Sequence, residues 1–318
     1  MTNVVVVHTD DTGRYIGPYG HDIETPALQA LADEGVLFRN AYCAGPTCSP
    51  SRSAFMTGSS PHSNGLIGLA HRGFSMHDYD RHLAGYLSER GYEAVLAGQQ
   101  HEVDREGMDD AEAAREVLGY DRVLEGDPDE FEIPIDHERT REDLANAAAA
   151  ADYVSGTEEP VFLSVGLYNT HKRFPFDQER IDPDCVQVPA PLPDVPAIRE
   201  EMAAYQVLAE YVDECADRVV EALRAAGTLE ETLVLFTTDH GIAFPRMKCN
   251  LFEGGTGISL IARFPEGAGV ESGVAEDALV SNVDLFPTFC ELLDLETPDW
   301  VEGSSLLGLV RGETDGVR

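Results

Sequence analysis

The chain has 318 residues, of which 58 are acidic and 22 basic, so its formal net charge is −36. Such an acidic surface repels phosphate backbones and acidic lipids, and we therefore expect neither nucleic acid nor an anionic membrane as a partner. Molar salt shortens the electrostatic screening length to about 3 Å, so the acidity also predicts adaptation to brine. The length allows one large α/β domain or two smaller ones.

The cysteines and the start of the chain bear on its compartment. Six cysteines are scattered without the spacing of zinc sites or disulfide frameworks, which predicts mostly small buried side chains. The opening apolar run, residues 3–9, is short and is followed at once by acids, which predicts a buried strand and not a signal peptide. No apolar run approaches the roughly 20 residues of a membrane-spanning helix, so we expect a cytoplasmic protein.

Strand-like and helix-like segments alternate along the chain. Short β-branched runs at 3–9, 92–98, 160–168 and 231–239 alternate with amphipathic stretches at 25–35, 81–91, 141–156 and 198–227. This order predicts an α/β fold with a mainly parallel sheet and helices on both faces. Thr25 before Pro26 predicts the start of the first helix, and Gly35 its end. We expect the acidic segment 102–140 and the proline-rich segment 181–196 to be long surface excursions.

Polar residues follow several of the predicted strands. In doubly wound sheets, ligands bind at the carboxyl ends of the strands. The residues found there are Asp10, Asp11, His101, His171, Asp239 and His240. Carboxylates suit a hard divalent cation, and imidazoles suit proton transfer. Singly, an aspartate pair is more often a turn or helix cap and a histidine more often structural, but their joint occurrence indicates a functional site.

The sequence CSPSR at residues 48–52 lies where a helix is expected to begin. Taken alone, a structural cysteine explains it equally well. Together with SAFMTG at 53–58 and PHSNG at 61–65, it resembles the sulfatase motif in which this cysteine is oxidised to formylglycine. Other sulfatase elements follow in family order across nearly the whole chain: Asp10-Asp11, Gly98-x-x-His101, Asn169-Thr170-His171, Asp239-His240-Gly241 and Lys248. Within the family, the sequences of residues 48–69 and 236–252 are most similar to those of the sulfamidase branch.

The resemblance implies an alkaline-phosphatase-like α/β fold and a single catalytic domain over residues 1–318. Sulfatases usually continue into a smaller C-terminal subdomain with an antiparallel sheet. The sequence ends near the point where that subdomain would begin, so we expect the subdomain to be missing from these 318 residues.

The resemblance also implies a metal site. Its ligands would be Asp10, Asp11, Cys48, Asp239 and His240, and its ion Ca²⁺, with Mg²⁺ or another divalent cation as alternatives. Many sulfatases have asparagine where His240 stands. Because imidazole is a softer ligand than an amide oxygen, the identity of the metal stays open.

For catalysis, the resemblance implies formylglycine at Cys48, made by a formylglycine-generating enzyme. One hydroxyl of its hydrated aldehyde would attack sulfur, and deprotonation of the second would expel sulfate. Arg52 would orient the diol, and His101 would act as a base. His171 and Lys248 would hold the sulfonate and protonate the leaving atom of a small anionic sulfate ester or sulfamate.

Three positions leave alternatives open. Gln99 stands where many sulfatases have lysine, and a neutral amide supplies no charge to the anion. A phosphonate or phosphate monoester hydrolase, or a catalytically impaired anion-binding relative, is therefore also considered. Lys172 is either a second sulfate contact or a surface residue. Ser51 either serves the modifying enzyme or caps the helix. The oligomeric state is not predicted.

Overall fold

The computed structural model describes residues 2–104, 106, 108–157 and 159–317. Within them, the main sheet has the strand order β5-β4-β6-β1-β7-β8-β2-β9. The strands are β1 (Asn3–Thr9), β2 (Val36–Phe38), β4 (Glu93–Gly98), β5 (Arg122–Leu124), β6 (Val161–Gly166), β7 (Thr232–Thr238), β8 (Leu260–Arg263) and β9 (Val274–Glu276). Among the described strand pairings of this sheet, the two made by β8 are antiparallel and the others parallel, which confirms the predicted mainly parallel sheet. A separate short pair joins β3 (Ala41–Tyr42) to β10 (Val280–Ser281).

Helices cover both faces of the sheet, as predicted. One face carries α1 (Pro26–Glu34), α6 (Glu138–Gly156) and α7 (Pro196–Ala226). The other carries α2 (Cys48–Thr57), α4 (Leu83–Ser88), α5 (Asp110–Glu116), α9 (Leu285–Leu292) and α10 (Leu307–Val310). Shorter turns are α3 (Pro61–Asn64), α8 (Glu253–Thr256) and the 3₁₀ segments Gly17–Tyr19, Ala70–Arg72, Tyr79–Arg81, Pro128–Glu130, Pro183–Cys185, Leu229–Glu231 and Asn282–Asp284.

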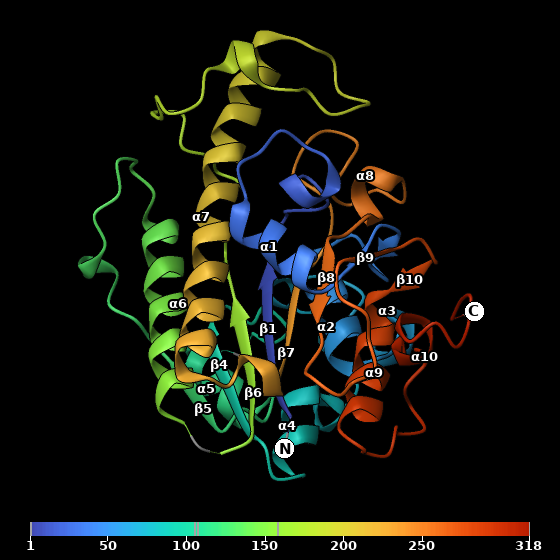
Figure 1. Ribbon diagram of the computed structural model, residues 1–318. Helices are drawn as coiled ribbons and strands as arrows, with labels where there is room; N and C mark the ends of the chain where they lie inside the picture. The colour runs from blue at the N-terminus through green and yellow to red at the C-terminus, as the bar shows by residue number, and fades with distance from the viewer. Residues whose placement is uncertain (1, 105, 107, 158, 318) are drawn as a thin grey trace.

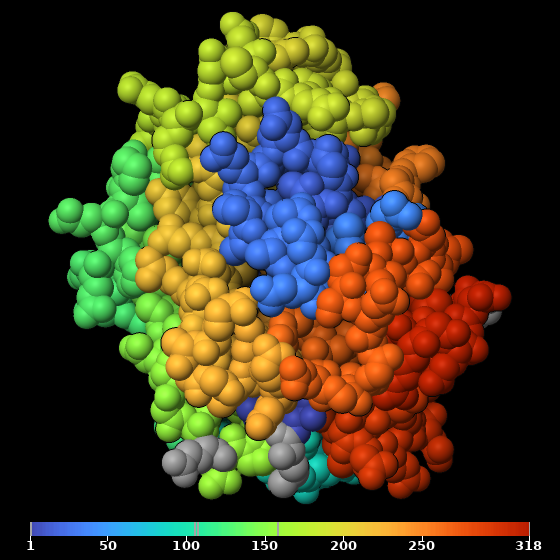
Figure 2. All heavy atoms as spheres, viewed as in Figure 1, coloured from blue at the N-terminus to red at the C-terminus, as the bar shows by residue number. Residues whose placement is uncertain are grey.

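Strand β1 lies at the centre of the sheet and contributes to two hydrophobic cores. Because successive side chains point to opposite faces, Val5 and Val7 pack with α6 and α7, whereas Val4 and Val6 pack with α2 and α9. Figure 1 shows α7 running beside α6 along one face and extending past the carboxyl ends of the strands. In Figure 2 the chain just before α7 covers this upper end of the molecule. None of the described helices is both long and apolar enough to span a membrane.

The boundaries of α1 agree with the prediction, but its capping does not depend on Thr25. The helix begins at Pro26 and ends before Gly35. The hydroxyl of Thr25 accepts from the backbone N–H of Gly17 and makes no cap bond. Instead, the carboxylate of Asp213 on α7 accepts from two backbone N–H groups in the first turn of α1, at 3.0 and 2.8 Å. The first turn is therefore satisfied from another helix.

Two further expectations have different outcomes. The segment 102–140 is not a plain surface excursion, because it contains α5 and the edge strand β5, where Leu96 of β4 pairs with Val123. Both elements are too short for their periodicity to stand out. The segment 181–196 is irregular and mostly exposed apart from one 3₁₀ turn, as expected. All six cysteines are free, and four of them are buried. The assignment of residues 1–318 to one domain stays a prediction.

Candidate active site

Parallel pairing of the central strands brings two acidic segments together. Thr9, the last residue of β1, lies opposite Thr238, the last residue of β7. The residues that follow, Asp10-Asp11 and Asp239-His240, therefore meet at the carboxyl edge of the sheet. Together with Cys48 they form a buried cluster whose potential ligand atoms all lie within 4.8 Å of one another. The five residues expected to bind a metal are thus brought to one point.

Helix α2 delivers Cys48 to this cluster. Cys48 is the first residue of α2, and its Sγ lies 3.3 Å from Asp10 Oδ1. The hydroxyl of Ser51 donates to the backbone carbonyl of Asp239 and accepts from Asn282 at 3.0 Å, which anchors the helix to the end of β7. Ser51 is therefore not the N-cap. That interpretation is wrong because the helix starts three residues earlier, after an extended Thr47.

Two carboxylates in the cluster have unsatisfied oxygens. Asp239 Oδ1 accepts from the backbone N–H groups of Asp11 and His240, at 3.0 and 2.7 Å. Asp239 Oδ2 and Asp11 Oδ2 are buried and have no hydrogen-bond partner among the described residues. Burial, together with the neighbouring carboxylate of Asp10, raises the pKa of both groups well above the ordinary value. A bound cation would satisfy these oxygens, so the donor set fits a metal.

The ring of His240 points a lone pair at the same place. Its Nδ1 lies 2.9 Å from the carbonyl oxygen of Gly241, so we assign the N–H to Nδ1. Burial lowers its pKa to about 3, which keeps the ring neutral. The Nε2 atom then faces Asp11 Oδ1 at 3.3 Å and Asp239 Oδ2 at 3.4 Å. A lone pair facing two carboxylate oxygens is repulsive unless a proton or a metal cation lies between them, and a metal cation would satisfy all three groups at once.

Two permanent cations border the cluster. Lys248 Nζ lies 2.6 Å from Asp11 Oδ1, and Arg52 approaches Asp10 and Asp239 at 3.6 Å each. Burial alone would raise the pKa of Asp10, but Arg52 and Lys248 hold it well below the usual range. When all three carboxyls are ionised they face two cations, which leaves one negative charge in excess. A divalent cation would reverse that sign and make the site attractive to an anion.

The predicted histidines lie around the same cluster. His101 Nδ1 and His171 Nε2 are each 3.9 Å from a carboxylate oxygen, of Asp10 and Asp11 respectively. Gln99 Nε2 donates to Asp10 Oδ2 at 3.2 Å and lies 3.3 Å from His101 Nδ1. Burial lowers the pKa of His101 to about 4 and also lowers that of His171. Both rings are consequently neutral near pH 7.

Several residues near the cluster were not anticipated from the sequence. His71 stacks on His101 with ring centroids 5.6 Å apart, and Tyr168 Oη lies 3.1 Å from His171 Nδ1. His71 lies in the short 3₁₀ segment Ala70–Arg72, outside any strand pattern, so no sequence signal marked it. Tyr168 lies two residues after the end of β6 and was detectable by the rule that located His171. Lys172 pairs with Glu201 on α7 at 2.7 Å, which favours the surface alternative for this lysine.

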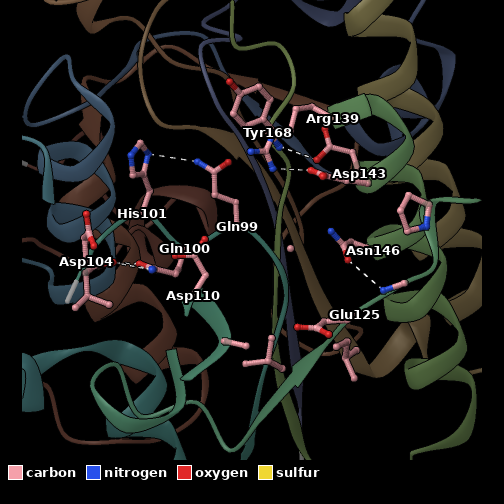
Figure 3. Close-up of a pocket in the computed structure, with 18 of the residues that line it drawn as sticks. Gln99, Gln100, His101, Asp104, Asp110, Glu125, Arg139, Asp143, Asn146 and Tyr168 are labelled. Atoms are coloured by element: carbon pink, nitrogen blue, oxygen red, sulfur yellow. Dashed lines mark hydrogen bonds and ion pairs between the residues drawn. The ribbon is translucent and has the colours of Figure 1, made fainter. Parts of the chain in front are cut away.

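A cavity of about 610 Å³ opens beside the cluster, along the ends of β4 and β5. Gln99, His101 and Tyr168 lie at the end nearest the cluster, and Glu125 lies toward the other end (Figure 3). Arg139 is among the residues that α6 contributes to the side of the cavity. A substrate held at the cluster therefore has room for an organic group.

Comparison with known proteins identifies this arrangement. The family model Sulfatase matches residues 2–295. The chain is 30% identical to human N-sulphoglucosamine sulphohydrolase, covering 96% of this chain and 64% of that protein, and 26% identical to an ulvan-active sulfatase of Formosa agariphila, covering 98% and 58%. A phosphonate monoester hydrolase of Silicibacter pomeroyi shares the fold, with a TM-score of 0.79, 21% identity and coverage of 99% and 77%. The 318 residues thus span less than two thirds of the length of these two curated relatives. The chain belongs to the sulfatase family.

Proposed function

We propose that this protein hydrolyses sulfate monoesters or sulfamates, with formylglycine at position 48 and a divalent cation in the Asp-His cluster. The observation that carries the proposal is the convergence of Cys48 with Asp10, Asp11, Asp239 and His240 within 4.8 Å. A cysteine used only for packing has no reason to lie among three buried carboxylates. Membership of the sulfatase family supports the same chemistry.

The cation would be held by the oxygens of the three aspartates and by Nε2 of His240. When bound, it would supply Lewis-acid polarisation of the anionic substrate and the charge that draws it in. Because oxygen donors outnumber nitrogen, we propose Ca²⁺, with Mg²⁺ as the first alternative to test.

The other catalytic steps are assigned to side chains around the cluster. Arg52 Nε and Nη2 are buried without hydrogen-bond partners, so they are free to donate to oxygens at residue 48. Lys248 presents a compact positive charge beside Asp11 and would neutralise sulfonate oxygens. His101 is neutral, because its pKa lies near 4, and can accept a proton from a hydroxyl at residue 48. Because its ring is neutral near pH 7, His171 would first take a proton from water and then pass it to the leaving oxygen or nitrogen while it holds the sulfonate.

The leaving group would lie in the cavity beside Gln99 and His101. Its volume of about 610 Å³ lies within the range of about 300–1,000 Å³ typical of small-molecule sites. One relative is named for N-sulphoglucosamine, so we propose a sulfated amino sugar as the first substrate to test.

The first test of this proposal is mass spectrometry of the peptide that contains Cys48. Protein made together with a formylglycine-generating enzyme should carry a residue about 18 Da lighter than cysteine. Converted protein should then release sulfate from N-sulfoglucosamine or from an aryl sulfate, and Cys48→Ala should abolish that release. Full conversion without any sulfate release would contradict the proposal.

The same preparation distinguishes the alternative hydrolase. An aryl phosphonate should be turned over more slowly than the best sulfated substrate. Faster phosphonate turnover would assign the protein to phosphonate monoester hydrolysis instead. Converted protein that binds sulfate but turns over neither class would be the impaired anion-binding relative.

A further inference from the structure

A buried histidine lies directly behind Arg52. His8 is on β1 and is 4% exposed, and its Nδ1 lies 2.8 Å from Arg52 Nη1. Because guanidinium can only donate, Nδ1 must be the acceptor. Within the described part of the chain, the other two nitrogens of the guanidinium, Nε and Nη2, have no hydrogen-bond partner.

The other nitrogen of His8 fixes this tautomer. His8 Nε2 lies 2.9 Å from the hydroxyl of Ser164 on β6, so Nε2 carries the hydrogen and donates it. Strand β1 pairs with β6, and His8 lies opposite Gly166. Ser164 is two residues before Gly166, so the side chains of His8 and Ser164 lie on the same face of the sheet. The order Ser164–His8–Arg52 is thus a chain of directional bonds that links the sheet to α2.

The ring of His8 has little freedom to turn. It packs edge-on against Phe55, one helical turn after Arg52, with centroids 6.4 Å apart. A Cβ atom placed on Gly166 would lie 2.9 Å from His8 Cε1, so the ring fills the space that this glycine leaves. Packing and hydrogen bonding therefore hold the ring in one orientation.

We propose that His8 is a positioning residue that fixes the Arg52 guanidinium so that its remaining donors point at residue 48. With Nη1 bound by His8, the donors on Nε and Nη2 face the cluster, 3.6 Å from Asp239 Oδ2 and Asp10 Oδ2. Without His8 the guanidinium can rotate toward Glu102, whose buried carboxyl also interacts electrostatically with Arg52. This inference rests on the proposed sulfatase function, but not on the identity of the metal or substrate.

The kinetic test uses converted protein and an aryl sulfate. His8→Leu should lower kcat by about 100-fold and change KM by a smaller factor. The reason is that a misplaced Arg52 guanidinium would disturb the geometry of the reacting groups more than it would weaken substrate binding. His8→Asn keeps an acceptor near the position of Nδ1, so it should regain most of that loss. The matched control is His82→Leu, since His82 is another buried histidine, which caps α4 by accepting from the N–H of Ala84 and is not part of the cluster. His82→Leu should lower the melting temperature and leave kcat unchanged.

A spectroscopic test does not depend on activity. In ¹⁵N-histidine-labelled protein, the His8 signals can be assigned from their loss in His8→Asn. They should show that Nε2 carries a proton and that Nδ1 does not. A wild type that turns over no sulfated substrate would defeat the proposed function, while this spectrum still decides the bond to Arg52. Any of three results would overturn the inference. These are a proton on Nδ1 of His8, a loss of kcat in His8→Asn equal to that in His8→Leu, and a kcat of His8→Leu as high as that of His82→Leu.

Discussion

The two sides of the carboxyl edge of the sheet differ in how tightly they are enclosed. On the β1–β7 side, Asp10, Asp11 and His240 are completely buried. On the β4–β5 side, the side chain of His101 is 24% exposed and lines a cavity of about 610 Å³. Binding a cation requires donors in fixed places, whereas admitting a substrate requires space. Under the proposed function, the enclosed side would hold the cation and the open side would admit the organic part of the substrate.

The position of the strands explains this difference. β1 and β7 lie inside the sheet with a neighbour on each side, so the residues that follow them are enclosed. β4, which precedes His101, is covered on its outer side only by β5, a three-residue edge strand with no strand beyond it in the sheet. Substitutions on the enclosed side should accordingly have the larger effects.

The largest effect is expected for Asp239→Asn. Asparagine keeps the oxygen that accepts from Asp11 and His240 but removes a buried charge, so cation binding should be lost and kcat should fall about 1,000-fold or more. The raised pKa of Asp239 indicates that its charge is costly when no cation is bound, so in EDTA the variant should melt no lower than the wild type. Calcium chloride should raise the melting temperature of the wild type only. An equal rise in both proteins would contradict the metal assignment.

The next largest effect distinguishes the two lysines of the chain. Lys248→Met removes the charge 2.6 Å from Asp11 and should lower kcat/KM for a sulfated substrate by about 100-fold. Lys172→Met removes an ion pair with Glu201 and should change kcat/KM by less than about threefold. Steady-state kinetics of the two variants provide the measurement. Similar losses would mean that Lys172 also contacts the substrate.

The next prediction concerns the substitution Gln99→Lys, because Gln99 lies between Asp10 on the enclosed side and His101 on the open side. An ammonium group near Asp10 and His101 would add a charge-assisted contact to the sulfonate, so kcat/KM should rise by up to about tenfold. The cation content, measured by atomic emission, should not change. A fall in kcat/KM with full cation content would indicate that the amide is required for the placement of His101.

The smallest effect is expected at Asp143, which supports the loop that carries His171. Its carboxylate accepts from the backbone N–H groups of Tyr168 and Asn169 at 2.8 Å each, yet burial raises its pKa to about 7. Because its unfolded pKa is about 3.9, the folded state binds the proton more tightly, and the stability from this group falls as pH rises toward 7. Asp143→Asn cannot titrate. Urea unfolding should therefore show the wild type losing stability relative to this variant between pH 5 and pH 8, and a constant difference would contradict the assignment.

The sequence predicted the central part of the fold well. Strands β1, β4, β6 and β7 and helices α1, α6 and α7 have strong, long patterns because each is buried on one or both sides. The residues that follow these strands could then be located by one rule, that ligands gather at carboxyl ends. This is why all the predicted metal and catalytic residues are found around one cluster.

What the sequence missed depends on contacts between distant segments. β5 is too short to show alternation, and the stacking of His71 on His101 depends on a loop path that no periodicity encodes. His8 directly follows the run of valines at residues 4–7, and no sequence pattern distinguished it from the rest of the strand. Its bond to Arg52 joins residues 44 positions apart and becomes visible only when α2 lies on β1.

The complete burial of α2 imposes an order of events on maturation. Every residue from Cys48 to Thr57 is buried, so an oxidising enzyme cannot reach the sulfur once the helix has docked onto the sheet. If position 48 becomes formylglycine, the reaction must be finished while this segment is still an extended peptide. A host in which the chain folds faster than it is oxidised would accumulate well-structured protein that later exposure to the enzyme cannot activate.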